Sequence, residues 1–150
     1  MNKSLMFTFF VLIFTFSLGS CKKKLQKIGC TDETATNFDA EAKDDDGSCT
    51  YNYNGKISFW FNEYRSNTLV DNGVTNLTVY IDDASVGTMN PSNWTAGPEC
   101  DGANRLTVTL QLGNYSNKNI NFIVRDQSGS SQFSGSIEAE ANNCVSRQLY

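Results

Sequence analysis

Histidine is absent from this chain of 150 residues. The usual triads and dyads take an imidazole as general base, so the sequence excludes them. Acid pairs remain, but Asp82 and Asp83 lie in an expected turn, and Glu138 and Glu140 lie near an expected strand end. Catalytic carboxylates of glycosidases converge from separate elements of a cleft, whereas adjacent acids in a turn are usually solvated. We therefore expect no enzyme activity.

Basic residues are also few. Lys and Arg total 12 against 16 Asp and Glu, which gives a net charge of −4. A nucleic-acid partner would require a basic stripe, so we expect none. The clearest basic cluster is a short segment containing Lys22, Lys23, Lys24 and Lys27. This segment is either held against anionic lipid head groups or a solvated linker, and the sequence leaves both readings open.

Long apolar runs are limited to one, at residues 5–18, preceded by Lys3. A transmembrane helix needs about 20 apolar residues, so this run is too short to span a bilayer. A basic residue followed by such a run is typical of a secretory signal peptide. We expect residues 1–20 to be that signal.

The residues that close the run are Gly19, Ser20 and Cys21. They resemble the lipobox of bacterial lipoprotein precursors, in which the cysteine is acylated and becomes the first residue of the mature protein. The resemblance implies that acyl chains such as palmitate on Cys21 anchor the protein in the cell envelope, with the outer membrane as the expected location. Whether it faces the periplasm or the cell surface stays open. Residues 21–28 would form the lipidated basic tether.

Five cysteines are present, so lipidation of Cys21 leaves an even number in an exported, oxidising setting. Three pairings are formally possible. Sequence locality favours Cys30 with Cys49 and Cys100 with Cys144. A zinc site is disfavoured, because the chain has no histidine and none of these four cysteines has a close Cys-x-x-Cys neighbour.

Residues 29–51 are too polar and too few to form a hydrophobic core, so we expect a disulfide to stabilise this segment. The segment resembles a repeat of exported Bacteroidetes proteins with the pattern Gly-Cys-Thr-Asp-Pro-x-Ala-x-Asn-Tyr, a spacer, and Asp-Asp-Gly-Ser-Cys-x-Tyr. Two positions depart from it: Glu33 replaces the proline and Phe38 replaces the tyrosine.

The second half of this module is an acidic turn. Hard cations such as Ca²⁺ take several carboxylate and carbonyl oxygens around a glycine bend, although the spacing here is not that of an EF-hand. The alternative is a solvated acidic loop that turns at Gly47. The candidate Ca²⁺ ligands are Asp44, Asp45, Asp46 and Ser48.

Residues 54–150 show a period of two. Apolar and polar residues alternate at 57–61, 77–81, 106–112 and 120–124, and further strands are expected around Phe133 and Ile137 and at 145–149. Turn-forming sequences separate these runs, and no window has a convincing helical stripe. This predicts an all-β fold, a small antiparallel β-sandwich of the immunoglobulin-like or transthyretin-like kind, preceded by the disulfide-stapled acidic mini-module.

The hairpin at 77–88, the Pro98 to Gly102 segment and the Gly135-Ser136-Ile137 run before Cys144 resemble a small β module of Bacteroidetes lipoproteins with no assigned activity. Asp101 interrupts the Cys-Gly pair of that module. The resemblance implies no catalytic residue.

Two functions follow as hypotheses. The first is a structural or interaction subunit of a larger outer-membrane assembly, with a protein partner that docks on an edge strand or an apolar patch. The alternative is a carbohydrate- or peptidoglycan-binding module, in which Trp60, Tyr80 and Trp94 form an exposed aromatic platform. Packing of these aromatics against a second surface or a loop is the competing reading.

Overall fold

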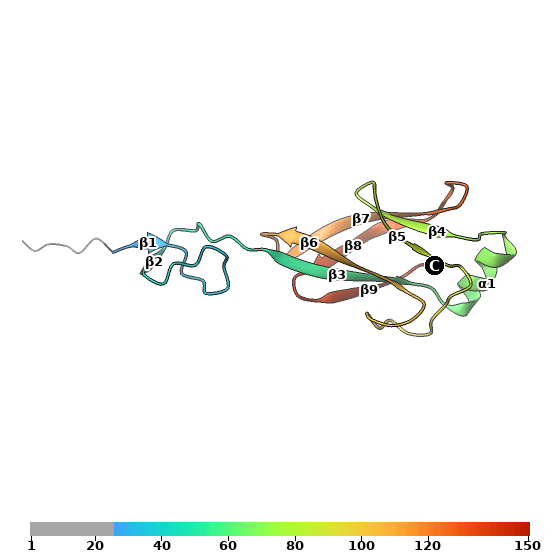
Figure 1. Ribbon diagram of the computed structural model, residues 1–150, viewed down its shortest axis with the longest axis horizontal. Helices are drawn as coiled ribbons and strands as arrows, with labels where there is room; N and C mark the ends of the chain where they lie inside the picture. The colour runs from blue at the N-terminus through green and yellow to red at the C-terminus, as the bar shows by residue number, and fades with distance from the viewer. Residues whose placement is uncertain (1–25) are drawn as a thin grey trace, which may run out of the picture.

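The computed structural model describes residues 26–150, and in it a small N-terminal module precedes a larger β-sandwich along one long axis (Figure 1). The predicted signal peptide, Cys21 and most of the tether lie outside the described residues. The module contains two short strands, β1 (Ile28–Gly29) and β2 (Asp44–Asp45). The rest of the chain forms β3 (Tyr53–Trp60), α1 (Glu63–Asp71), β4 (Leu77–Ile81), β5 (Ala84–Met89), β6 (Leu106–Gly113), β7 (Asn117–Asp126), β8 (Ser131–Glu140) and β9 (Cys144–Gln148).

The sandwich consists of a three-stranded sheet, β6-β3-β9, and a four-stranded sheet, β5-β4-β7-β8. The predicted all-β fold is therefore confirmed. The inward residues of both sheets form one core, in which Phe59 of β3 packs against Phe122 of β7 with ring centroids 5.1 Å apart. This alternation of buried and outward residues is the physical reason that the period-two pattern predicted the strands.

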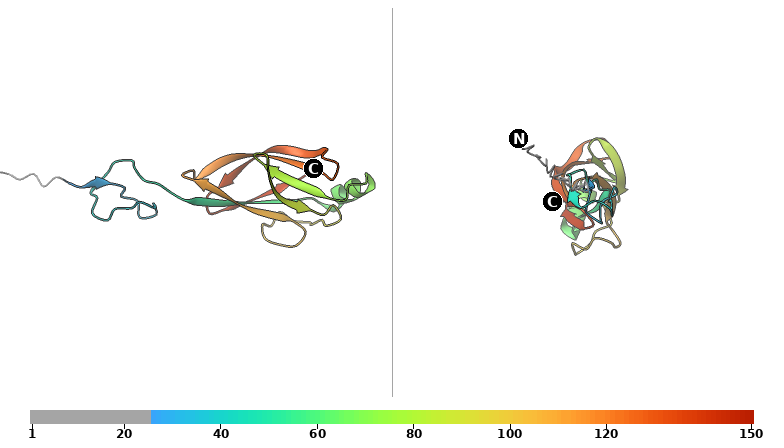
Figure 2. Two further views of the ribbon diagram at one scale, coloured as in Figure 1. Left: turned by 45° about the horizontal axis from the view of Figure 1, so that its top comes forward. Right: turned by 90° about the vertical axis from the view of Figure 1, so that its left-hand side faces the viewer.

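One pairing differs from the antiparallel expectation: β9 runs parallel to β3, with Ile57 opposite Val145. The seven strands from β3 to β9 alternate in direction, so the first and the last point the same way (Figure 2). When they become neighbours, their pairing must be parallel. Period-two patterns specify faces and not strand order, so the sequence pattern could not reveal this.

Helix α1 contradicts the expectation that no helix forms. The side chain of Asn62 caps it by accepting a hydrogen bond from the backbone N–H of Arg65 at 3.0 Å. Gly73, with φ of +76°, follows its end. Only Ser66 and Leu69 of the helix are buried, so its apolar stripe is too narrow to register as a period of 3.6. Within residues 26–150, no helix meets the length and apolarity needed to cross a membrane.

A loop covers the outer face of the three-stranded sheet. Ser58 and Trp60 alternate with the core residues Ile57 and Phe59, yet both are buried. The segment 90–105 lies over Ser58: Thr107 Oγ1 contacts Ser58 Oγ at 3.1 Å and donates to the carbonyl of Cys100. The second half of β3, residues 57–60, is therefore buried on both faces, whereas Asn54 and Lys56 of its first half are exposed.

The β4–β5 hairpin turns at Asp82 and Asp83, which have φ of +47° and +65°. Two successive positive φ angles are typical of the type I′ turn that joins short hairpins, and Asp tolerates them better than most residues. The adjacent acids are turn formers, as predicted.

Candidate functional site

Both predicted disulfides are present. Cys30 and Cys49 are joined across the module, with Cα atoms 4.8 Å apart. Cys100 and Cys144 are joined with Cα atoms 6.0 Å apart, and this bond ties the covering segment 90–105 to the first residue of β9. One bond thus closes the module, and the other holds the loop on the sheet.

Asp32 organises the first half of the module. Its carboxylate accepts from the N–H and the hydroxyl of Thr34 at 2.9 and 2.8 Å and from the hydroxyl of Tyr51 at 2.7 Å. These hydrogen bonds, the one from the Thr34 N–H first, lower the pKa of Asp32. The same contact raises the pKa of Tyr51 to about 12, because it favours the neutral phenol. Tyr51 thereby links the two ends of the module.

The contact between the module and the sandwich is small. The N–H of Tyr51 donates to Asn114 Oδ1 at 2.7 Å, and the Tyr51 ring stacks on Tyr53, at the start of β3, with centroids 4.9 Å apart. Asn114 lies in the turn after β6. These contacts hold the module at the end of the sandwich where β3 begins (Figure 1).

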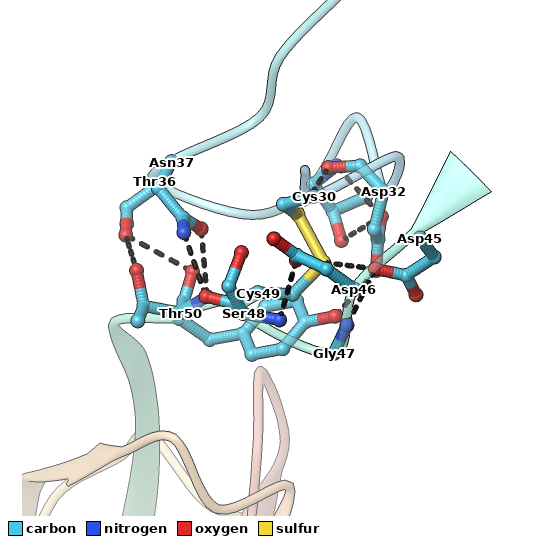
Figure 3. The surroundings of a disulfide bond; sticks show 12 residues. Cys30, Asp32, Thr36, Asn37, Asp45, Asp46, Gly47, Ser48, Cys49 and Thr50 are labelled. Carbon is cyan, nitrogen blue, oxygen red and sulfur yellow. Dashed lines mark hydrogen bonds between the residues drawn. A yellow bond between two sulfur atoms is a disulfide. The ribbon is translucent and has the colours of Figure 1, made fainter. Parts of the chain in front are cut away.

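The acidic turn proposed for Ca²⁺ is organised by its own backbone. Asp45 Oδ1 accepts from the N–H of Gly47 at 3.1 Å, and Asp46 Oδ1 accepts from the N–H of Ser48 at 2.9 Å (Figure 3). Hydrogen bonds from Ser48 lower the pKa of Asp46. In the part of the chain that the structure describes, no three His, Cys, Asp or Glu side chains gather as a metal site. Calcium binding by Asp44, Asp45, Asp46 and Ser48 stays a prediction.

The aromatic platform predicted from Trp60, Tyr80 and Trp94 does not form. Trp60 is only 8% exposed although it points away from the core that Ile57 and Phe59 join, so its predicted exposure is wrong. Tyr80 alternates with the core residues Val79 and Ile81 of β4, in the other sheet, so it lies on the opposite outer face and is half-buried. Trp94 is 37% exposed within the covering segment. The three side chains do not share a surface.

A pocket that the sequence did not indicate lies where β5 ends and β6 begins. Its volume is about 140 Å³, and it is lined by Thr88, Met89, Asn90, Asn93, Asn104 and Arg105. We call it the Arg105 pocket. Most of its lining comes from the two ends of the segment 90–105. Loops longer than about 12–15 residues without secondary structure are uncommon in compact domains and often have a function, and this segment is longer than that. That length is the one signal by which the pocket was detectable in the sequence.

Side-chain contacts fix the walls of the Arg105 pocket. Asn90 Oδ1 accepts from the N–H of Ser92 at 2.9 Å, and Asn104 Nδ2 donates to the carbonyl of Trp94 at 3.0 Å. Arg105 Nη2 donates to Thr95 Oγ1 at 3.0 Å, whereas its Nε and Nη1 are buried without a hydrogen-bond partner in the described residues. Arg105 thus lines the pocket with a guanidinium whose Nε and Nη1 are shielded and which forms no ion pair within the described residues.

A second, shallower groove of about 350 Å³ lies near the Cys100–Cys144 disulfide. Lys56 and Asp101 line it and form an ion pair with Nζ and Oδ2 3.3 Å apart. The two charges compensate each other, so the groove presents little net charge to a ligand.

In comparisons with known proteins, no protein-family model, no curated protein and no solved structure matches the chain. The likeness to Bacteroidetes lipoproteins therefore rests on the sequence motifs alone.

Proposed function

We propose that this protein is a non-enzymatic, lipid-anchored envelope protein that serves as an interaction subunit of a larger outer-membrane assembly. Acyl chains on Cys21 would hold it to the membrane, and the sandwich would bind a protein partner. The signal-like run at residues 5–18, the Gly19-Ser20-Cys21 sequence and the even number of remaining cysteines support the anchor.

The observation that carries the proposal is the direction of the chain. The module and the start of β3 lie at one end of the sandwich, and α1 lies at the other (Figures 1 and 2). The segment 90–105 begins beside α1, where Ser66 Oγ donates to the carbonyl of Pro91 at 2.6 Å. A tether before the module therefore places α1 and the start of this loop farthest from the anchored end.

Large exposed apolar side chains occur at that far end. Tyr64 and Val70 of α1 are 76% and 46% exposed, and Trp94 lies in the adjoining loop. Aromatic residues are enriched at protein interfaces, so these positions favour a protein partner at the end opposite the tether. The absence of histidine from the sequence supports the non-enzymatic part of the proposal.

Membrane fractionation tests the anchor. Replacing Cys21 by Ser should move the protein from the membrane fraction to the soluble fraction with its fold retained, whereas Ser20→Ala should leave it in the membrane. A Cys21→Ser variant that stayed in the membrane would refute lipid anchoring.

A mild-detergent pull-down from the native membrane tests the partner. We expect the wild-type chain to bring down a defined membrane complex, and Tyr64→Glu to lose it, because a charge at an apolar contact is costly to desolvate. Tyr115, 64% exposed in the turn between β6 and β7 near the module, offers the matched control. Equal recovery with Tyr64→Glu and Tyr115→Glu would rule out the far end as the binding surface.

A further inference from the structure

The charge of Arg105 lacks a protein partner. The ion pairs among residues 26–150 involve Lys27 and Lys56 and none involves Arg105. Two other half-buried arginines lie over aromatic rings: Arg65 over Phe133 and Arg147 over Phe122, each 5.6 Å from the ring centroid. The guanidinium of Arg105 donates one hydrogen bond, to the Thr95 hydroxyl, while its Nε and Nη1 are buried without a hydrogen-bond partner in the described residues.

A partly buried guanidinium has lost part of its hydration, which costs free energy unless polar or charged groups compensate for it. Gly102 contributes to this shielding, since a Cβ at that position would lie 3.2 Å from Arg105 Nε. The charge therefore acts on the adjacent pocket through protein instead of through water, and its attraction for an anion there is screened less than at an open surface. An anionic group bound in the pocket would offset the cost.

The other walls of the pocket suit hydroxyl groups. Asn90 and Asn104 each use one amide atom to hold the loop, which leaves the Asn90 Nδ2 donor and the Asn104 Oδ1 acceptor for a ligand. Asn93 and Thr88 add a further amide and a hydroxyl to the lining. Met89 is the one apolar residue of the lining and is 6% exposed, so most of the exposed lining is polar.

We propose that the Arg105 pocket binds the carboxylate-bearing ring of an acidic sugar. Arg105 supplies the charge that attracts the carboxylate, and the three asparagines and Thr88 supply donors and acceptors for ring hydroxyls. Asn104 also binds the backbone carbonyl of Trp94, which fixes this side of the loop. This site is distinct from the proposed protein interface and does not depend on it.

The test is nuclear magnetic resonance titration of the full chain in mild detergent. The probes are glucuronate, galacturonate, N-acetylmuramate and N-acetylneuraminate, each beside a neutral sugar without the carboxylate, together with a short aspartate-containing peptide. We expect at least one acidic sugar to shift the side-chain signals of Asn93, Asn104 and Arg105. Its neutral counterpart should bind at least about tenfold more weakly, because it lacks the attraction between the carboxylate and the Arg105 charge.

Matched variants locate the binding. Arg105→Gln should weaken the acidic sugar about tenfold or more. Arg125→Gln should not, because Arg125 is exposed on β7 and donates to the carbonyl of Gly129 away from the pocket. If Arg105→Gln fails to fold, as judged by its amide spectrum, Asn93→Ala replaces it and should weaken both the acidic and the neutral sugar.

Several results would overturn the proposal. They are no shift with any acidic sugar, equal binding of acidic and neutral sugars, and unchanged affinity in Arg105→Gln or, in its place, Asn93→Ala. Tighter binding of the aspartate peptide than of every acidic sugar would assign the pocket to a protein ligand instead.

Discussion

The module and the sandwich reach an ordered structure by different means. In the module, Cys30 and Ala35 are the buried apolar residues, and a disulfide and side-chain hydrogen bonds to the backbone hold the turns. In the sandwich, a continuous core of 17 residues joins the two sheets. Burial of apolar area dominates folding, so only the second region has an intrinsic source of stability of that kind.

The two disulfides stabilise these regions in different ways. Cys30–Cys49 closes a segment that lacks a core, so the bond substitutes for one. Cys100–Cys144 joins a loop to a sheet that already has a core, so the bond keeps the loop over Ser58.

The largest effect is expected from a core truncation. Phe59 is completely buried, and Phe59→Ala should lower the free energy of unfolding of the sandwich by about 3–5 kcal/mol. Phe38 of the module is 39% exposed and is the matched control. Chemical denaturation monitored by tryptophan fluorescence measures both variants. Both tryptophans lie in the sandwich, so a comparable loss with Phe38→Ala would mean that the stability of the sandwich depends on the module.

Removal of each disulfide comes next. In the chain-entropy account, a bond spanning 44 residues contributes about 4 kcal/mol and one spanning 19 residues about 3 kcal/mol. Cys30→Ser with Cys49→Ser should abolish amide protection within residues 29–50 and leave the sandwich protected. Cys100→Ser with Cys144→Ser should lower the stability of the sandwich and leave the module protected. Hydrogen exchange resolves the two regions, and a simultaneous loss in both would refute their independence.

The Tyr51–Asp32 hydrogen bond predicts a pH dependence confined to the module. The pKa of Tyr51 is raised from 10.0 to about 12, so its contribution to stability is full below pH 10 and is lost as the pH rises towards 12. The pKa of Asp32 is lowered, so its contribution is present above its ordinary value of 3.8 and is lost as the pH falls through the lowered pKa.

Absorbance titration at alkaline pH checks the tyrosine part. The difference between wild type and Tyr51→Phe isolates this phenol, and Asp32→Asn should return its pKa towards 10. Asp126 also has a lowered pKa but lies in the sandwich, so Asp126→Asn should leave the Tyr51 titration unchanged. A Tyr51 phenol that titrates normally in wild type would contradict the hydrogen bond.

Calcium is expected to have the smallest effect. If the acidic turn binds it, a tenfold excess of Ca²⁺ over the dissociation constant should stabilise the module by about 1.4 kcal/mol. Calorimetry of the purified chain measures the binding heat, and Asp46→Asn should remove it, whereas Asp126→Asn should not. No heat and no shift in the melting temperature of the wild type would end the calcium hypothesis.

Much of the architecture was predictable from local patterns. The alternation at 57–61 and 77–81 is visible in sequence because each inward residue meets the core. The disulfides were predictable because each cysteine pair falls within one structural unit. Helix α1 was not, since only Ser66 and Leu69 of it are buried and its capping residue Asn62 gives no periodic signal.

By itself, the sequence determined where strands form, which cysteines pair and where the chain turns, because these depend on neighbours a few residues away or on one local unit. Three features follow from the packed structure alone: β9 lies parallel beside β3, Trp60 is buried, and Arg105 has no counter-charge among residues 26–150. Each of these features depends on the position of the segment 90–105 or of the C-terminal strand in the folded molecule. Such contacts join residues far apart in the chain, and no local pattern encodes them.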